Sequence, residues 1–325
     1  MVSVDVKDRK ILYELDQNCR QSNTQIGKKV GLKKDVVAYR IKRMEDEGIL
    51  TGYWTAINTF KLGYYVFRIY ITFVDVATDT KEEIISYFEK QKNLWALISS
   101  KGPADMNVIL WINDIYQFNK YWNSTLEKYG NYFGKYTVSI LTSVMSLKKT
   151  YLSPDASIDK NRILYNTNCS GQAVEIDELD WKILNNLALN ARIPLINLAE
   201  KLGCSSQTAS YRLKQLQDKD VIQAFRIGVD GAKIQLQSYA IDIYLKDHSQ
   251  RQKMLEYIIQ LPYTFDIMIM NVGWADITFQ VMIENVEKLM EIMETLDSKF
   301  PHAIRRQEFW ITKQVHKERW LPELS

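Results

Sequence analysis

The chain has 325 residues, of which 46% are hydrophobic and 25% are charged, the balance of a soluble globular protein with a packed core. It contains no apolar run of about 18 residues, which excludes a membrane-spanning helix. The mixed charges of residues 1–10 are not those of a signal peptide, so we expect a cytoplasmic protein with no membrane partner. The net charge of +3 is too small to indicate a nucleic-acid partner by itself.

The cysteines and histidines give no sign of a metal site or a disulfide framework. Cys19, Cys169 and Cys204 are far apart, and no Cys-x-x-Cys motif occurs. The three histidines lack the spacing of metal ligands. We therefore expect neither a metal nor a cofactor.

The sequence repeats itself at a constant shift of 172 positions, without gaps, across residues 4–50. Tyr39-Arg40, for example, matches Tyr211-Arg212. The repeat continues with small shifts, so that Gly102–Asp105 matches Gly273–Asp276. Two copies of one structural unit are therefore expected in a single chain.

The first part of each copy has the pattern of three helices and a wing. Apolar residues recur at helical spacing after Asp5 and Asp177, which suit N-caps. Gly31 and Gly203 suit the end of a short second helix, because glycine adopts the left-handed conformation that often follows a helix. A third helix and a short β-wing follow. We predict winged helix-turn-helix domains over residues 1–57 and 175–229.

The second part of each copy begins with a strand whose apolar residues alternate. Tyr65, Phe67 and Ile69 lie on one face, with Arg68 on the other. Helix and strand patterns then alternate in the order βαββαβ, which is the ferredoxin-like arrangement. We predict an α+β fold, with ferredoxin-like sensing domains over residues 58–155 and 230–325. Residues 156–174 are polar and are predicted to be a linker.

Several segments resemble the Lrp/AsnC family, the leucine-responsive and asparagine-related transcriptional regulators. These segments are Asp8–Leu12, Arg20, Val30–Leu32, Tyr39–Glu45, Gly48–Tyr53 and the Gly-x-Ala-Asp turns. The resemblance covers nearly the whole chain, once per half. It implies a DNA-binding transcriptional regulator, not an enzyme, in which one chain is a covalent counterpart of the family's dimer.

The sequence departs from the family pattern in three ways. Lys33 stands where a capping serine is common, and Asp220 replaces the glycine seen at Gly48. Ala104 and Ala275 replace a larger residue before the aspartate of each turn. The last departure argues against a standard amino-acid effector.

The third helix of each copy is the predicted contact with double-stranded DNA. In the first copy the expected contacts are Lys33, Lys34, Asp35, Ala38, Tyr39, Arg40, Lys42 and Arg43. In the second they are Ser205, Ser206, Gln207, Ser210, Tyr211, Arg212 and Lys214. For Arg40 and Arg212 a structural ion pair with Asp8 or Asp180 is an equally good interpretation.

The first copy is expected to bind DNA more strongly than the second. Residues 33–44 carry five basic residues and one acid, whereas residues 205–216 carry two basic residues and no acid. Because the two helices differ at most outward positions, the chain is expected to prefer two unlike half-sites.

A small effector is the functional alternative for the two glycine turns, at Gly102, Asp105, Gly273 and Asp276. Their structural interpretation is that the glycines form the turns and the aspartates cap them.

Val66, Tyr70, Val74 and Tyr244 lie on a sheet face that the helices do not cover, and we expect the other copy's sheet to cover it. The turns would then lie at the periphery, where further chains join to form a homo-oligomer.

An enzyme is the rival interpretation of the whole chain. Siroheme decarboxylases of alternative haem synthesis resemble the same family and can be fused two-unit chains. Their chemistry needs basic or histidine side chains in the sensing-domain cleft. The turn segments Gly102–Trp111 and Gly273–Val281 contain no histidine or arginine, which argues against this alternative.

Overall fold

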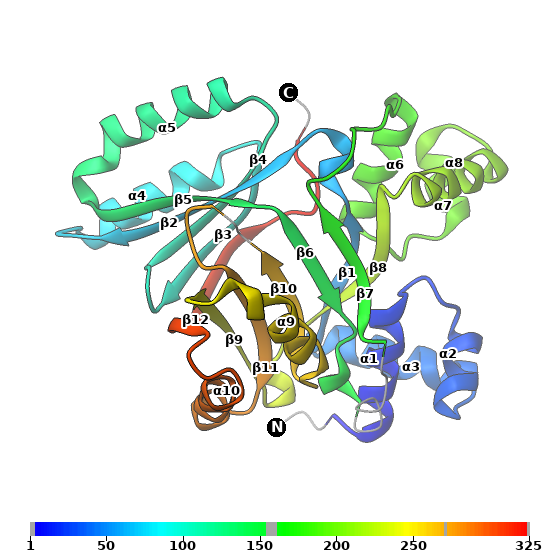
Figure 1. The fold of residues 1–325 in the computed structure, drawn as a ribbon. Helices are drawn as coiled ribbons and strands as arrows, with labels where there is room; N and C mark the ends of the chain where they lie inside the picture. The colour runs from blue at the N-terminus through cyan, green and yellow to red at the C-terminus, as the bar shows by residue number, and fades with distance from the viewer. Residues whose placement is uncertain (1–3, 154–160, 270–271, 324–325) are drawn as a thin grey trace.

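The structure, a computed structural model, describes residues 4–153, 161–269 and 272–323. It contains two repeats, each a winged helix-turn-helix followed by a ferredoxin-like unit, so the predicted α+β fold class is confirmed (Figure 1). None of the described helices is long and apolar enough to cross a membrane. The predicted boundary between residues 155 and 156 lies outside the described residues.

The two helix-turn-helix modules have matching elements. The first consists of α1 (Val6–Gln17), α2 (Asn23–Val30), α3 (Lys34–Asp46) and strand β1 (Leu50–Ile57). The second consists of α6 (Glu178–Leu189), α7 (Leu195–Leu202), α8 (Ser206–Asp218) and strand β8 (Ile222–Val229). Asp5 and Asp177 cap α1 and α6 in capping boxes, as expected.

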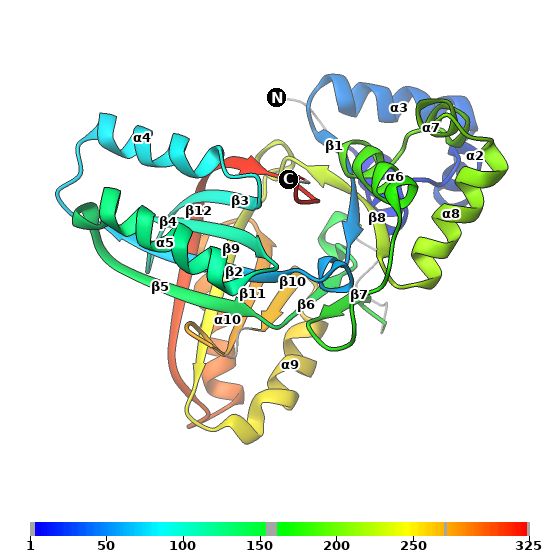
Figure 2. The same cartoon turned by 90° about the horizontal axis from the view of Figure 1, so that it is seen from above.

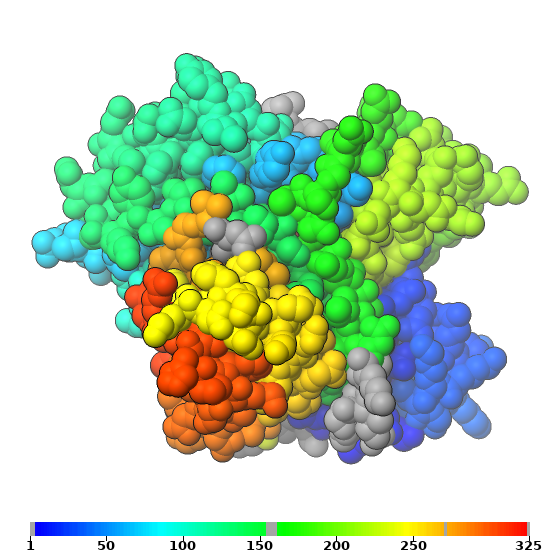
Figure 3. All heavy atoms as spheres, viewed as in Figure 1, coloured from blue at the N-terminus to red at the C-terminus, as the bar shows by residue number. Residues whose placement is uncertain are grey.

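The two modules pack on each other through their wings. β1 and β8 form a two-stranded antiparallel sheet in which Trp54 pairs with Arg226. Arg20 Nη1 donates to the Ala191 carbonyl at 2.7 Å, and Arg192 donates to the Cys19 carbonyl. One hydrophobic core runs through both modules. The two modules therefore share one core, and each is visible as a separate lobe beside the sheets, blue and yellow-green in Figure 3.

The sensing units follow the predicted βαββαβ order. The first contains β2 (Tyr65–Phe73), α4 (Thr78–Glu89), β3 (Leu94–Lys101), β4 (Met106–Ile112), α5 (Ile115–Tyr129), β5 (Phe133–Leu141) and β6 (Ser143–Leu147). The second contains β9 (Gln237–Leu245), α9 (Arg251–Gln260), β10 (Thr264–Ile269), β11 (Ile277–Ile283), α10 (Val286–Lys299) and β12 (Ile304–Glu318). Short 3-10 helices span Thr59–Leu62, Gly130–Tyr132, Thr150–Leu152, Ala232–Ile234 and His248–Gln250. A further strand, β7 (Ile163–Asn168), lies in the segment predicted as a linker.

Each unit's last strand crosses to the other unit. β12 pairs with β9 of its own unit over Ile304–Ile311 and then with β3 of the first unit. β5 pairs with β2, and its continuation β6 pairs with β10 of the second unit. The ten strands therefore join in the order β5-β2-β4-β3-β12-β9-β11-β10-β6-β7 (Figure 2). Backbone hydrogen bonds fix the two halves to each other.

The part of this strand order that belongs to each sensing unit, here called that unit's sheet, buries apolar residues on both of its faces. On the outer faces, α4 and α5 pack on the first sheet and α9 and α10 on the second, with Ile69 and Ile241 at 0% exposure. Between the sheets, Val66 and Tyr70 of the first unit pack with Trp310 of the second. The prediction that one copy's sheet covers the other is confirmed for Val66 and Tyr70, which are each 2% exposed.

The glycine turns do not lie at the periphery, so that expectation is wrong. Each turn packs on the last strand of the other unit. A Cβ added to Gly102 would lie 2.5 Å from the Phe309 carbonyl oxygen, and one on Gly273 would lie 2.2 Å from the Val138 carbonyl oxygen. Both glycines also have positive φ, 140° and 91°. The turns need glycine because the crossing strands come so close.

Gly273→Ala is expected to lower the free energy of unfolding by about 1–3 kcal/mol more than Gly203→Ala. The reason is that the methyl group added at Gly273 meets backbone atoms, whereas the one added at Gly203 does not. Gly203 also has a positive φ, 64°, but no heavy atom lies within 4 Å of its added Cβ. That variant therefore carries backbone strain alone. Urea unfolding of both variants measures the difference, and equal losses would contradict the tight packing of the Gly273 turn.

Candidate functional site

The predicted DNA-contact residues lie on the outer faces of α3 and α8. Most are exposed, and Tyr39 and Tyr211 are 69% and 63% exposed. Arg40, Arg43 and Arg212 are half-buried. Ser205 caps α8, whereas Lys33 makes no side-chain cap on α3.

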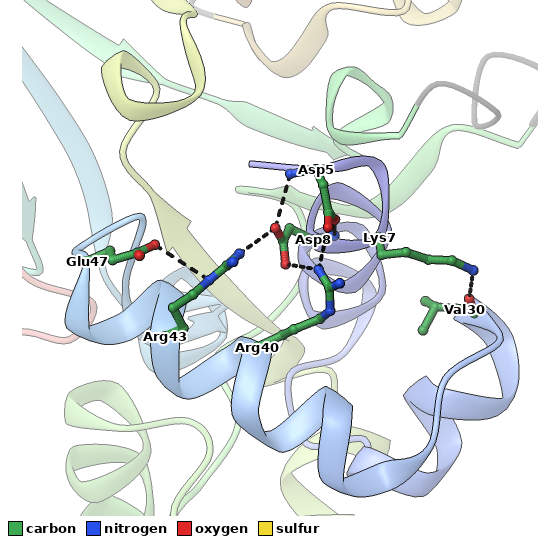
Figure 4. A network of polar contacts seen from close by, with 7 residues as sticks. All are labelled: Asp5, Lys7, Asp8, Val30, Arg40, Arg43 and Glu47. Atoms are coloured by element: carbon green, nitrogen blue, oxygen red, sulfur yellow. Dashed lines mark hydrogen bonds and ion pairs between the residues drawn. The ribbon is translucent and has the colours of Figure 1, made fainter. Parts of the chain in front are cut away.

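Several of the predicted basic contacts form ion pairs within the chain. Arg40 Nη1 lies 2.7 Å from Asp5 and 2.8 Å from the fully buried carboxylate of Asp8, which also accepts from Arg43 (Figure 4). Lys42 pairs with Asp46 at 2.5 Å. The structure thus gives Arg40 the structural ion pair that the sequence left open, and three of the five basic residues of 33–44 are paired with acids.

The second module repeats this arrangement. Arg212 Nη1 lies 2.8 Å from Asp177 and 3.5 Å from Asp180. The remaining contact residues stay predictions. The same is true of the effector at Gly102, Asp105, Gly273 and Asp276, and of the homo-oligomer.

The two turn aspartates hold neighbouring strands. Asp105 Oδ2 accepts from the Phe73 amide at 2.9 Å, and Asp276 Oδ2 accepts from the Leu245 amide at 2.8 Å. Both therefore have a structural role in which the carboxylate fastens the turn to the end of β2 or β9.

The end of the inter-sheet space that lies nearest the wings is hollow. A cavity of about 190 Å³, here called the inter-sheet cavity, lies between the sheets and β1. Its walls include Trp54, Arg68, Trp95, Ile98, Trp111, Tyr165, Asp266, Met268, Gln280, Glu318 and Trp320. Aromatic and aliphatic groups with a few polar ones are typical of a ligand site.

Arg68 is the buried cation of this cavity. It is 7% exposed, and its Nε has no hydrogen-bond partner among the described residues. Its Nη1 meets only the sulfur of Met268, at 3.4 Å, and its guanidinium lies 5.0 Å from the Tyr70 ring centre. No carboxylate of the described chain lies within ion-pair distance. A buried arginine without such a partner is suited to bind an anionic group of a ligand.

A second cavity of about 480 Å³, here called the wing-side cavity, adjoins the first. The two share five lining residues, Trp54, Asp266, Gln280, Glu318 and Trp320. The Trp54 and Trp320 rings stack with centres 3.8 Å apart and planes inclined by 9°. This stack separates two parts of one larger space.

A buried charged cluster lies beside the wing-side cavity, and Lys149, Arg226 and Asp266 of this cluster line its wall. Asp16 of α1 is 0% exposed, and its Oδ2 lies 2.5 Å from Arg226 Nη2. Lys149 Nζ lies 3.1 Å from Asp16 Oδ1. Asp266 accepts from the Ser146 hydroxyl at 2.5 Å, and that hydroxyl also accepts from Arg226.

Burial raises the pKa of each of these acids, but the neighbouring charges make the net shifts differ in direction. Burial raises the pKa of Asp266 and outweighs the attraction of Arg226, which holds the same pKa down. Loss of solvent around Glu318, with the charge of Asp266, raises the pKa of that carboxyl too. For Asp16, burial works upward but the charges of Arg226 and Lys149 prevail, so its pKa is lowered.

These shifts give opposite dependences of stability on pH. The lowered pKa of Asp16 contributes stability that is present above its unfolded pKa and is lost as pH falls through the folded pKa. The raised pKa of Asp266 contributes stability that is present below its unfolded pKa and is lost as pH rises through the folded pKa.

The two repeats place different chemistry around this space. Trp54 and Arg226 are 172 positions apart, the shift of the repeat, and occupy matching places in β1 and β8. Ala96 and Asp266 also occupy matching places. Ala96 of β3 pairs with Glu318 of β12, and Asp266 of β10 pairs with Ser146 of β6, so each lies opposite the last strand of the other unit. At these two pairs of matching positions, the first repeat has Trp54 and Ala96 where the second has Arg226 and Asp266.

The far end of the inter-sheet space is closed by a packed cluster. The buried carboxyl of Asp242 accepts from the indole N–H groups of Trp274, at 2.7 Å, and Trp310, and from Thr278 at 2.5 Å. Tyr70 stacks on Trp274 with ring centres 3.9 Å apart. The inter-sheet cavity therefore does not extend to the Gly273 turn.

Comparisons with known proteins identify the modules. A winged helix-turn-helix DNA-binding family matches residues 4–51 and 176–223. The transcriptional regulator LrpA of Pyrococcus horikoshii is 32% identical over 111 residues, 34% of this chain and 77% of that protein. The proline dehydrogenase transcriptional activator of Rhodobacter capsulatus is 40% identical over 86 residues, 26% of this chain and 53% of that protein.

The chain belongs to the Lrp/AsnC family. Its modules are of the DNA-binding winged type, and the tandem arrangement expected from the sequence is confirmed.

The whole chain matches a different kind of protein. The solved structure of the siroheme decarboxylase NirDL covers 99% of this chain and 95% of its own, with a TM-score of 0.66 and 12% identity. The same enzyme in complex with an iron-uroporphyrin III analogue covers 97% and 94%, with a TM-score of 0.65 and 12% identity. The two-repeat fold is therefore shared from end to end with this enzyme.

This finding corrects the interpretation of the chain as a regulator without enzymatic activity. The regulator LrpA matches 34% of the chain, whereas the NirDL fold accounts for 99%. The turn segments Gly102–Trp111 and Gly273–Val281 contain no histidine or arginine, but the cavities do not depend on them for cations. The structure places the cavity's cations elsewhere, at Arg68 in β2 and at Lys149 and Arg226 beside the wings.

The sequence did contain a signal for these residues. Arg68, Arg226 and Asp266 are each the single charged residue of an otherwise uncharged strand. A lone charge on the inner face of a strand is costly unless it has a partner or a function.

Replacing the two buried arginines should separate function from structure. Arg226→Met is expected to lower the free energy of unfolding by about 3–5 kcal/mol, because it removes a partner of the buried Asp16 carboxylate. Arg68→Met should leave stability unchanged or raise it, because Arg68 makes no ion pair of that kind. Denaturant unfolding at pH 7 measures both, and an equal loss in Arg68→Met would contradict a ligand-binding role for Arg68.

Proposed function

We propose that this chain is a decarboxylase that acts on an iron tetrapyrrole of the siroheme class. The observation that carries the proposal is the end-to-end match of the two-repeat fold with siroheme decarboxylase NirDL. At 12% identity the match concerns the fold, so the chemistry must come from this chain's own residues.

A tetrapyrrole carboxylate presents two features, a flat apolar ring system and negative charges at its edge. The inter-sheet cavity and the wing-side cavity offer a counterpart to each. Trp54, Trp95, Trp111 and Trp320 supply flat aromatic faces. Arg68 supplies a guanidinium for a carboxylate.

A macrocycle needs both cavities at once. Ligand pockets usually measure about 300–1,000 Å³, and the inter-sheet cavity alone has about 190 Å³. Only the Trp54–Trp320 stack and the side chains beside it separate this cavity from the wing-side one. We infer that the substrate parts these two rings and stacks on them.

Loss of CO2 from a carboxylate needs a group that holds the acid in place and a proton for the carbon left behind. Arg68 is suited to the first task. Asp266, a half-buried acid whose pKa is raised by burial, is suited to the second. The apolar walls favour a reaction in which a localised carboxylate charge is dispersed.

Arg68→Met is expected to weaken siroheme binding roughly 10- to 100-fold, because hydrogen bonds to a charged group contribute about 1.5–3 kcal/mol each. Titration of siroheme with the protein, followed by its absorption spectrum, measures affinity, and mass spectrometry of the tetrapyrrole counts the CO2 lost. Lys313→Met is the control, because Lys313 is exposed on β12. No spectral shift and no CO2 loss with the unmodified chain would overturn the proposal.

The chain is expected to bind one tetrapyrrole, not two. Although the fold has two repeats, their halves of the cavity differ, with Trp54 in one and Arg226 in the other. They therefore form one composite site. The absorption titration should reach its end point at one equivalent per chain, and an end point at two equivalents would contradict this assignment.

A further inference from the structure

The charged cluster beside the wing-side cavity joins all four modules of the chain. Asp16 comes from the first helix-turn-helix and Arg226 from the wing of the second. Ser146 comes from the last strand of the first sensing unit, and Asp266 from β10 of the second. Lys149 follows β6 and also donates to the Ile227 carbonyl at 3.1 Å.

The pairing within the cluster is unequal. It holds two cations, Arg226 and Lys149, and two acids, Asp16 and Asp266. Asp16 binds both cations, with three contacts of 2.5 to 3.1 Å. Asp266 has no ion pair of that length among the described residues and is held by the Ser146 hydroxyl.

Asp266 is also the acid with access to the proposed substrate. It is half-buried and lines both cavities, whereas Asp16 is 0% exposed and lines neither. Glu318 lines both cavities as well, but its carboxylate has no hydrogen bond to a described residue that would hold it in one orientation.

We propose that Asp266 donates the proton that replaces the lost carboxylate, and that Asp16 is a positioning residue that keeps Asp266 neutral by holding both nearby cations. This inference rests on the proposed function. In the step, the bond between the carboxylate carbon and the adjacent side-chain carbon breaks and CO2 leaves. The electron pair stays on that side-chain carbon, conjugated with the ring, and the Asp266 proton forms the new C–H bond. Solvent then returns a proton to Asp266, so no oxidant or reductant is needed.

The charges around Asp266 determine whether a substitution nearby raises or lowers the pKa of its carboxyl. The groups that face it are Asp16 of α1, Arg226 of β8, Ser146 of β6, Lys149 and Tyr151 after β6, Tyr165 of β7 and Glu318 of β12. Removing the Asp16 charge ends its repulsion of the Asp266 carboxylate and frees two cations to attract it. Both changes favour ionised Asp266.

Infrared titration tests the protonation of Asp266 without any substrate. A neutral carboxyl has a C=O band that disappears on ionisation, and Asp266→Asn assigns that band. Asp16→Asn should move the midpoint of the band to lower pH by about one unit or more. Lys149→Met, which removes a cation and leaves Asp16 paired with Arg226, should move it to higher pH. Opposite shifts cannot come from general loosening of the fold.

Asp8→Asn is the matched control. Asp8 is another fully buried acid of α1 paired with two arginines, Arg40 and Arg43, and it is not part of the cluster. That variant should leave the midpoint unchanged. If Asp16→Asn does not fold, Lys149→Met still tests the inference. A midpoint that moves in neither variant, or equally in Asp8→Asn, overturns it.

The pH dependence of the decarboxylation then connects protonation to the reaction. The alkaline limb of the rate profile should shift with the infrared midpoint, downward in Asp16→Asn and upward in Lys149→Met. If the midpoints shift but siroheme loses no CO2, the proposed function fails while the control of Asp266 by Asp16 stands. If CO2 is lost at full rate in Asp266→Asn, the proton donor is misassigned although the function holds.

Discussion

Each sheet of this protein has one face that its own two helices leave uncovered, and the burial of that face determines the rest of the structure. Val66 and Tyr70 on one sheet and Trp310 on the other are almost fully buried only because the sheets face each other. The crossing of β12 onto β3 and of β6 onto β10 then fixes the two sheets by backbone hydrogen bonds. Because both units belong to one chain, the pairing does not depend on concentration, and each half can change without its partner.

Because the two halves can change in sequence independently, one cavity can combine aromatic and charged lining residues at matching positions. In a symmetric dimer, a tryptophan at position 54 would face a tryptophan and an arginine at position 226 would face an arginine. Here Trp54 and Arg226 pair across β1 and β8. Ala96 and Asp266 likewise occupy matching places in the two repeats and differ in chemistry, although they do not pair with each other. An aromatic surface for a ring and a polar surface for its carboxylates can therefore meet in a single site.

The helix-turn-helix modules contribute to the site as well as to the fold. Their wings close the cavity, and Asp16 of α1 compensates two buried cations that belong to other modules. At the same time Arg40 and Arg212, which are candidates for phosphate contacts, are paired with acids of their own modules. Buried ion pairs contribute little net stability, but removal of one partner is costly, which ties the modules to one arrangement.

Much of the fold could be predicted from the sequence, because its signals are local. The 172-residue repeat, the capping residues Asp5 and Asp177, and the alternation around Arg68 are all visible in short stretches. The site could not be predicted in the same way. Asp16, Lys149, Arg226 and Asp266 come from four separate stretches of the chain, and the packing of α1 on β8 and the pairing of β6 with β10 bring them together. The turns at Gly102 and Gly273 were wrongly placed for the same reason, since nothing local shows that β12 and β5 pass over them.

The central claim is that a tetrapyrrole binds between the two sheets beside the wings. A crystal structure of the chain with an iron-uroporphyrin III analogue tests it most directly. The account predicts the macrocycle between β2 and β10, with Trp54 and Trp320 parted and a carboxylate on the Arg68 guanidinium. A macrocycle bound at the Asp276 turn or on the outer helices, with the Trp54–Trp320 stack intact, would contradict it.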